Sequence, residues 1–128
     1  MIVVDASVMI DVLVKEAGEG HISSALAAGG ELFAPSIMPA ECMSARWRMD
    51  RTGAITQKQS REAMGSLAVW PVTLVDPQTL MERAWRHRHA VRISDAFYVA
   101  CAELLALPLL TCDRRLARAD TAVEVRIA

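Results

Sequence analysis

Four acidic residues in the 128-residue chain are placed where carboxylates could act together: Asp5, Glu41, Asp95 and Asp113. Glu41 and Asp95 have mainly apolar neighbours, so we expect both side chains to be at least half-buried. Buried carboxylates without basic partners are costly, and a group of them is tolerated mainly where a divalent cation takes up the charge. Ligands that are all oxygen favour Mg²⁺ or Mn²⁺ over zinc. Such a site can activate water for hydrolysis without a Ser, His or Cys nucleophile.

Each acid taken alone also has a structural interpretation. An Asp that follows a strand commonly forms a turn or caps the next helix. Asp113 could simply cap a short helix over 114–118. The metal hypothesis therefore requires that all four carboxylates meet at one place.

Histidine and cysteine do not offer a competing zinc site. No histidine is spaced from a cysteine as zinc ligands are, and the three cysteines form no C-x-x-C pair; these residues are His21, His87, His89, Cys42, Cys101 and Cys112. We interpret the cysteines as small buried apolar residues and segment 87–89 as a solvated helix end.

Two other classes of protein also use an Asp at the end of the first strand. Aspartyl-phosphate phosphatases resemble D-x-D sequences and hold phosphate with a lysine, whereas Ser7 stands two residues after Asp5 and the only lysines are Lys15 and Lys58. A phospho-receiver module would need a lysine near the last strand, where the chain has none. The lysine positions disfavour both classes.

The elements that must position the acids alternate along the chain. Apolar and β-branched runs predict strands at 2–4, 32–34, 72–75, 108–111 and 123–126. Periodic segments predict helices at 7–14, 22–28, 37–51, from 57 to the proline at 71, after Asp76-Pro77, at 95–106 and at 114–118. This alternation indicates a parallel sheet covered by helices on both faces, whose ligands bind at the carboxyl ends of the strands. Asp5 and Asp113 each follow a strand at that edge.

Several local signals support the helix boundaries. We expect Ser36 to cap the helix at 37–51, which tolerates Pro39 in its first turn. Thr56 and Gln59 resemble a capping box. The helix after Asp76-Pro77 is expected to pack through four apolar residues, Leu80, Met81, Ala84 and Trp85. The helix at 95–106 is apolar on nearly every side and should be central.

Composition places the chain among soluble, cytoplasmic, single-domain proteins. Its residues are 53% apolar, and no apolar run approaches the roughly 20 residues that cross a bilayer. The net charge of −1 identifies no partner class, but residues 1–45 carry one base against six acids and residues 46–128 carry thirteen against nine. Arginines could form a phosphate-binding rim: Arg46, Arg48, Arg51, Arg83, Arg86, Arg88 and Arg92.

Four segments in register resemble the motifs of PIN-domain proteins, and they cover nearly the whole chain. Segment 3–8 (VVDASV) resembles the opening motif, 39–41 (PAE) the helix-borne glutamate, 94–100 (SDAFYVA) the third acidic motif, and 110–116 (LTCDRRL) the fourth. The small size and the D-A-x-Y form resemble in particular the toxins of VapBC toxin–antitoxin pairs.

The resemblance implies a fold and an activity. The fold would be α/β, a three-layer α/β/α PIN-like (Rossmann-like) domain over residues 1–128, with a central, mostly parallel sheet of about five strands. The activity would be Mg²⁺- or Mn²⁺-dependent endonucleolytic hydrolysis of RNA that leaves a 5′-phosphate and a 3′-hydroxyl, with Asp5, Glu41, Asp95 and Asp113 as catalytic and metal-binding residues. The implied partners are a cognate antitoxin and a second copy of the chain. An inactive PIN scaffold that binds RNA or antitoxin without cleavage is the alternative.

Three hydroxyl groups lie beside the acids in these motifs. We expect Ser7 and Thr111 to orient a carboxylate or a phosphate oxygen. Ser44 stands where toxins of this group often carry Asn, and its hydroxyl can still donate a hydrogen bond. Apolar residues of the middle helices, namely Met38, Met43, Met49, Met64 and Trp47, either belong to the core or form a groove for an antitoxin helix.

Overall fold

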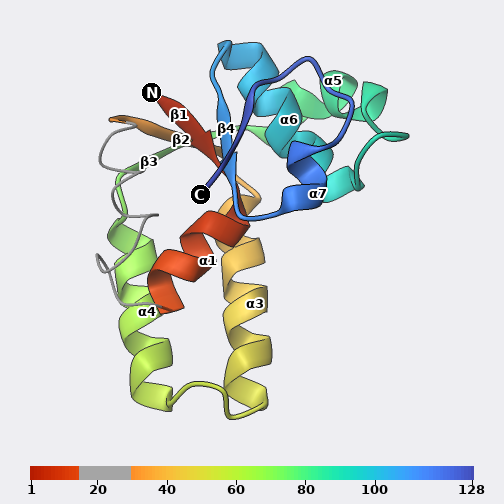
Figure 1. Cartoon of the computed structure of the whole chain (residues 1–128). Helices are drawn as coiled ribbons and strands as arrows, with labels where there is room; N and C mark the ends of the chain where they lie inside the picture. Colours follow the sequence, from red (N-terminus) through yellow and green to blue (C-terminus); the bar gives the residue numbers. More distant parts are fainter. Residues whose placement is uncertain (15–29) are drawn as a thin grey trace.

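The computed structural model describes residues 1–14 and 30–128, which build one parallel sheet (Figure 1). Its strands are β1 (Ile2–Val4), β2 (Leu32–Pro35), β3 (Val72–Val75), β4 (Leu109–Thr111) and β5 (Val125–Ile127). The strand order is β3-β2-β1-β4-β5, and every pair is parallel. The predicted α/β fold with about five strands is therefore confirmed. The last strand begins two residues later than expected.

Helices lie on both sides of the sheet, as right-handed crossovers require. They are α1 (Ala6–Val14), α3 (Met38–Arg51), α4 (Gln57–Val69), the 3-10 helix η1 (Pro77–Leu80), α5 (Met81–Arg86), α6 (Ile93–Leu105) and α7 (Arg114–Ala117). Helices α1, α3 and α4 form one group and α5, α6 and α7 the other (Figure 1). In the part of the chain that the structure describes, no helix is long and apolar enough to cross a membrane. The helix expected at 22–28 lies outside the described residues.

The strand order reverses between β1 and β4. From β1 the chain adds β2 and then β3 on one side, and after β3 it returns to add β4 and β5 on the other. Val3 pairs with Leu109 and Val4 with Leu110, so the two strands end side by side. In parallel sheets this switch point is where ligands bind. Asp5 follows β1 and Asp113 follows β4, which brings both acids to it.

Helix α6 is the central helix, as its composition predicts. It packs on β1, β2 and β4, and residues 98–102 are buried without interruption. The helix ends at Ala106, whose left-handed backbone (φ 54°) stops the helical hydrogen bonding. A rigid, buried helix therefore carries Asp95 in its first turn.

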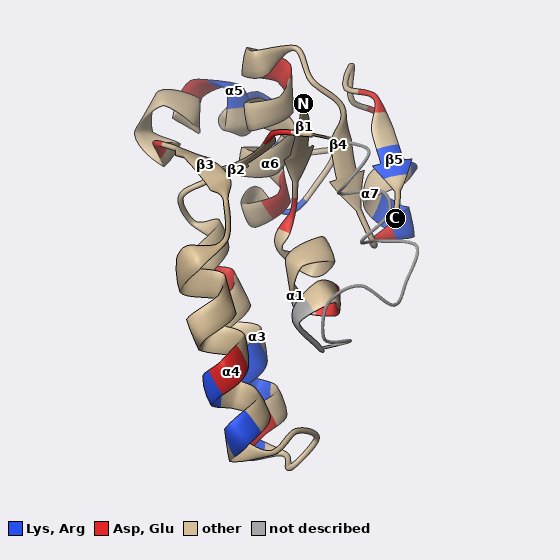
Figure 2. Ribbon diagram, turned by 90° about the vertical axis from the view of Figure 1, so that its left-hand side faces the viewer, with Lys and Arg blue, Asp and Glu red and all other residues tan. Residues whose placement is uncertain are grey.

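Helices α3 and α4 form a hairpin that projects from the sheet, with α1 against its base (Figures 1 and 2). The capping box at Thr56 is confirmed, since its hydroxyl accepts from Gln59 N–H and the Gln59 side chain accepts from Thr56 N–H. The prediction that Ser36 caps α3 is wrong. Its N–H donates to Val75 O at 2.8 Å, so the chain is still bound to the sheet there, and Ile37 occupies the cap without a side-chain bond.

The predicted packing face of α5 is half wrong. Leu80 and Ala84 are buried, but Met81 and Trp85 are 58% and 61% exposed. The buried stripe of α5 is narrower than predicted, because Leu80 and Ala84 are four residues apart on one face, whereas Met81 and Trp85 lie about 100° further round the helix. Positions 81 and 85 consequently share a solvent-facing stripe.

Candidate active site

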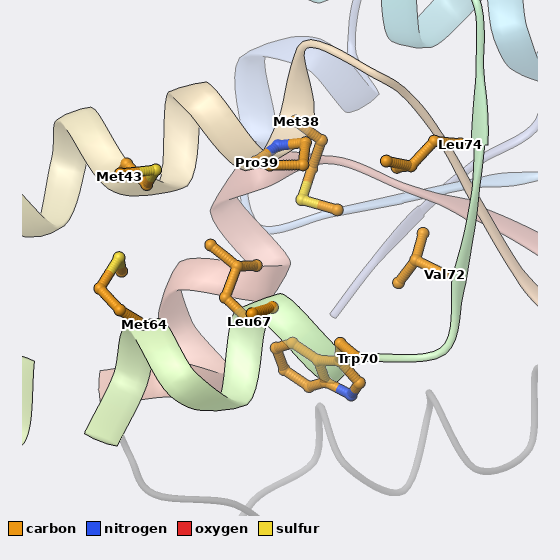
Figure 3. Close-up of a pocket in the computed structure, with 9 residues that line it drawn as sticks. Met38, Pro39, Met43, Met64, Leu67, Trp70, Val72 and Leu74 are labelled. Carbon is orange, nitrogen blue, oxygen red and sulfur yellow. The ribbon is translucent and has the colours of Figure 1, made fainter. Parts of the chain in front are cut away.

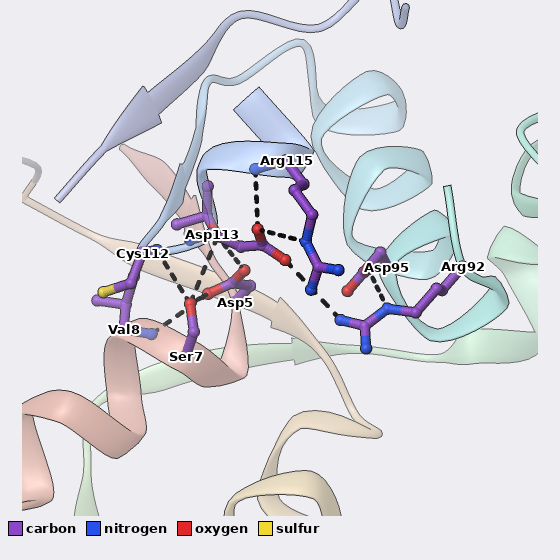
Figure 4. A network of polar contacts seen from close by, with 9 residues as sticks. Asp5, Ser7, Val8, Arg92, Asp95, Cys112, Asp113 and Arg115 are labelled. Atoms are coloured by element: carbon purple, nitrogen blue, oxygen red, sulfur yellow. Dashed lines mark hydrogen bonds and ion pairs between the residues drawn. The ribbon is translucent and has the colours of Figure 1, made fainter. Parts of the chain in front are cut away.

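Asp5 lies at the bottom of the site, with 5% of its surface exposed. Ser7 Oγ donates to Asp5 Oδ1 and Thr111 Oγ1 donates to Asp5 Oδ2, both at 2.5 Å. The backbone N–H of Val8 donates to Oδ1 at 3.2 Å (Figure 4). All three donors are neutral, and within residues 1–14 and 30–128 no lysine or arginine pairs with this carboxylate.

Burial dominates the electrostatics of Asp5. Desolvation raises its pKa above the ordinary 3.8, and the three hydrogen bonds lower it only in part. The negative charge of Asp95 raises the pKa of Asp5 further. The ionised form of Asp5 is therefore short of positive charge, the condition that a bound cation relieves.

The same two hydroxyls join β1 to the turn after β4. The backbone N–H of Cys112 donates to Ser7 Oγ at 3.0 Å, and the backbone N–H of Asp113 donates to Thr111 Oγ1 at 3.0 Å. Thr111 is fully buried, so its hydroxyl is fixed between an acceptor and a donor. Ser7 and Thr111 thus set the position of Asp5 relative to the backbone that carries Asp113.

Asp113 caps α7, as the structural interpretation of this acid proposed. Its Oδ1 accepts from Arg115 N–H at 2.9 Å, and the Arg115 side chain lies 3.6 Å away. These contacts, the backbone hydrogen bond first, lower the pKa of Asp113. Only 25% of the side chain is exposed. Capping uses one carboxylate oxygen, so it does not exclude a second role for the other.

Asp95 has a basic partner, contrary to the expectation from its apolar helix. Arg92 Nε donates to Asp95 Oδ2 at 3.0 Å, and Arg92 Nη2 lies 3.9 Å from Asp113 Oδ2 (Figure 4). Arg92 is the N-cap residue of α6, and its extended backbone turns the side chain back over the first turn. The hydrogen bond to Asp95 and the charges of Asp95, Asp113 and Glu41 raise the pKa of Arg92.

Glu41 enters the site from α3. Tyr98 donates its hydroxyl to Glu41 Oε1 at 2.5 Å, and the Tyr98 ring is 1% exposed. Burial, then the contact with Glu41, raises the pKa of Tyr98, so it remains a donor. From the sequence, Tyr98 was noted only as part of the D-A-x-Y form and was assigned no role of its own. Its position three residues after Asp95, on the same helical face, was the signal that it serves the site.

Ser44 and most of the predicted arginine rim lie elsewhere. Ser44 is exposed on α3, and no hydrogen bond of the described residues connects it to the acids. Arg46 is buried, with one nitrogen 3.4 Å from Gln59 O on α4, which excludes it from a solvent-facing rim. Arg83, Arg86 and Arg88 contact groups of α5 and α6 instead. Arg92 and Arg115 are the arginines that these contacts place at the acids, and sequence analysis missed Arg115.

His87 also departs from its prediction. Its side chain is 14% exposed and lies 3.2 Å from Glu103, so it belongs to the α5–α6 contact rather than to a solvated end. The cysteine prediction is confirmed for Cys42 and Cys101, which are buried free thiols. Burial raises the pKa of each to about 12, so neither is a thiolate nucleophile at neutral pH. Cys112 is only partly buried.

The residue types at this edge fit a divalent cation, because the donors are carboxylates and hydroxyls and the buried Asp5 has only neutral partners. In this arrangement the acidic side chains do not point toward one common position. Over the described ranges 1–14 and 30–128, no three Asp, Glu, His or Cys residues form a metal-ligand cluster as they stand. Asp95 and Asp113 face Arg92, and Glu41 faces Tyr98. A cation held by Asp95 and Asp113 would therefore compete with Arg92.

Known proteins resemble this chain over almost its whole length. Residues 2–122 match the PIN domain family. The chain is 41% identical to ribonuclease VapC3 and 34% identical to ribonuclease VapC1 of Mycobacterium tuberculosis, over 92% and 91% of its length and 86% and 89% of theirs. Its fold matches a toxin–antitoxin complex from Klebsiella pneumoniae with a TM-score of 0.71 at 19% identity, covering 96% of this chain and 95% of that one. The chain thus belongs to the PIN domain family and, within it, to the VapC ribonucleases.

Proposed function

We propose that the chain is an endoribonuclease that hydrolyses RNA phosphodiester bonds and acts as the toxin of a type II toxin–antitoxin pair. Its kinship with VapC ribonucleases supports the reaction. We assign Mg²⁺ or Mn²⁺ as the cofactor, and Asp5, Glu41, Asp95 and Asp113 as the residues that hold it. The observation that carries this assignment is the nearly inaccessible carboxylate of Asp5, whose hydrogen-bond donors among the described residues are all neutral.

The chain's own residues would prepare this site in three ways. Ser7 and Thr111 fix both oxygens of Asp5, and Tyr98 fixes one oxygen of Glu41. The fixed oxygens leave little reorganisation for binding or for the transition state. A divalent cation, when bound, would favour ionisation of the attacking water and stabilise charge on the departing oxygen. Arg92 and Arg115 would attract the RNA phosphate to the mouth of the site.

Purified protein should cleave RNA oligonucleotides in Mg²⁺ or Mn²⁺ and not in EDTA, leaving 5′-phosphate ends. Asp95→Asn keeps the shape of the side chain and removes one charge, and it should lose cleavage. Denaturing gels with 5′-end analysis measure both results. If RNA binds but stays intact with either metal across a broad oligonucleotide set, the alternative of an inactive RNA-binding scaffold replaces this proposal.

The antitoxin partner would occupy the apolar groove between α3, α4 and the edge strand β3. The residues that line it are Met38, Pro39, Met43, Met64, Leu67, Ala68, Trp70, Val72 and Leu74 (Figure 3). Of the methionines, Met38 is buried in the core, whereas Met43 is 55% exposed. An open apolar groove bordered by flexible methionines fits the apolar face of an amphipathic helix.

A charge placed in this groove should separate binding of the antitoxin from RNA cleavage. Met43→Glu buries a carboxylate if the partner helix docks, so co-expressed antitoxin should no longer neutralise the toxin, while purified Met43→Glu still cleaves RNA. Leu104→Glu is the matched control, because Leu104 is also a large exposed apolar residue (41%) but lies on α6, outside the groove. Growth rescue and pull-down measure the effect. Normal rescue of Met43→Glu would exclude the groove as the docking surface.

A homodimer completes the proposal. Large apolar side chains exposed on α5, Met81 and Trp85, supply surface that a two-fold partner could bury. Light scattering at micromolar concentration distinguishes the dimer from a monomer.

A further inference from the structure

Arg92 contacts two of the site acids, and its side chain is largely exposed to solvent. Its guanidinium bonds Asp95 and lies near Asp113, but 69% of the side chain is exposed. Both contacts use an Oδ2 atom, and Asp113 uses its other oxygen, Oδ1, to cap α7. Arg92 therefore lies at the Asp113 oxygen that capping leaves available and at one of the two oxygens of Asp95.

We propose that Arg92 is an exchangeable counter-ion: it holds Asp95 and Asp113 while the site lacks metal, and it transfers to an RNA phosphate when a divalent cation takes these carboxylates. This role rests on the proposed function. A guanidinium and a divalent cation repel each other and compete for these two Oδ2 atoms, so binding of the cation weakens the hold of Arg92 on the carboxylates. The displaced side chain stays tethered at the N-cap of α6, at the mouth of the site.

The surroundings of Arg92 favour a phosphate as its second partner. A hollow of about 150 Å³ lies between Arg92 and Arg115, with Asp95 and Asp113 on its wall. Once a cation neutralises the two carboxylates, both guanidiniums face this hollow without their present acidic partners. Arginine binds phosphate through two parallel N–H groups, which makes a phosphodiester the ligand that suits the vacated position.

The exchange predicts that loss of Arg92 raises the affinity for metal and lowers the rate of RNA cleavage. Removing Arg92 removes a competitor, so Arg92→Ala should bind Mn²⁺ about two- to fivefold more tightly, the range expected when exposed ion pairs are lost. The same variant loses a phosphate contact, so its kcat/KM for RNA should fall about tenfold or more, and the slope of log kcat/KM against log salt should shrink by about one. Arg92→Lys keeps a positive charge without the paired N–H groups. Its Mn²⁺ affinity and its kcat/KM for RNA should lie between those of the wild type and Arg92→Ala.

Calorimetric titration with Mn²⁺ alone measures the first effect, and RNA cleavage at several KCl concentrations measures the second. Arg126→Ala is the matched control, because Arg126 Nε also donates to a carboxylate, Glu124 at 2.8 Å, on the exposed edge strand β5. Arg126→Ala should change neither the Mn²⁺ affinity nor the salt dependence of RNA cleavage. Equal or weaker Mn²⁺ binding by Arg92→Ala would overturn the counter-ion role, and an unchanged salt slope would overturn the transfer to phosphate. If the wild type binds no Mn²⁺ either, the metal site of the proposed function fails first.

Discussion

Replacing Asp5 with Asn should abolish RNA cleavage and yet leave the metal-free protein at least as heat-stable as the wild type at neutral pH. Loss of a metal ligand removes several kcal/mol of transition-state stabilisation, which at about 1.4 kcal/mol per tenfold is a loss of roughly 100-fold or more. The stability result follows from the raised pKa of Asp5. Asn is neutral and nearly isosteric, so it removes the cost of burying a charge.

The pH dependence has a definite sign. Because the folded pKa of Asp5 lies above the unfolded value of 3.8, the contribution of this group to stability is full below 3.8 and is lost as pH rises through the folded pKa. The advantage of Asp5→Asn should therefore be largest at neutral pH and shrink under mild acid. Saturating Mg²⁺ or Mn²⁺, at about 100 times the dissociation constant, should stabilise the wild type by about 2.7 kcal/mol and the variant by less.

Thermal melting in EDTA and in Mg²⁺ or Mn²⁺, at neutral pH and under mild acid, measures these effects. Asp11→Asn is a comparison on α1, the helix that follows Asp5, away from the strand ends. An Asp5→Asn protein that melts clearly lower in EDTA and still cleaves RNA would show that Asp5 is only a structural cap.

Replacing Thr111 with Val should destabilise the protein by about 1–3 kcal/mol and weaken metal binding by roughly 10- to 100-fold. Valine has the shape of threonine but no hydroxyl. Asp5 Oδ2 loses its donor, and the N–H of Asp113 loses its acceptor, at a side chain that is fully buried. The carboxylate of Asp5 then becomes still harder to ionise, so the destabilisation should be smaller under mild acid.

Thr111→Ser supplies the control, because it keeps the hydroxyl and loses only a methyl group. Denaturant unfolding and Mn²⁺ titration compare the two variants. We expect the serine variant to bind metal like the wild type. A valine variant with wild-type stability and metal affinity would mean that Ser7 alone positions Asp5.

Much of the fold could be predicted because local signals specify it. The apolar runs of β1 and β3 and the capping box at Thr56 act within a few residues, through backbone sterics and short-range hydrogen bonds. The predictions were wrong where contacts with a neighbouring helix or strand determined the local structure. Ser36 resembles a cap, but β3 binds its N–H. Trp85 lies next to the buried Ala84 on α5, but the elements that pack on this helix cover only one stripe of it, and the tryptophan is exposed.

The site could be predicted by residue type but not by its internal contacts. Motif spacing indicated which strand ends carry Asp5 and Asp113, and the parallel topology places those ends side by side. No spacing shows which of many arginines reaches the acids, because that depends on where long side chains extend from distant helices. Thus Arg46 turns into the α3–α4 hairpin while Arg92 faces Asp95. Whether all four acids share one cation remains a prediction.

The bond between Thr111 and Asp5 spans 106 residues, and this separation orders events during protein synthesis. Asp5 is translated 106 residues before the threonine that orients its carboxylate. At about 5–20 residues per second, the interval is roughly 5–20 s. Parallel pairing of β1 with β4 cannot begin earlier. Until Thr111 and Cys112 have emerged, the nascent chain therefore lacks the hydroxyl and the backbone N–H group that hold Asp5 and Ser7 in place.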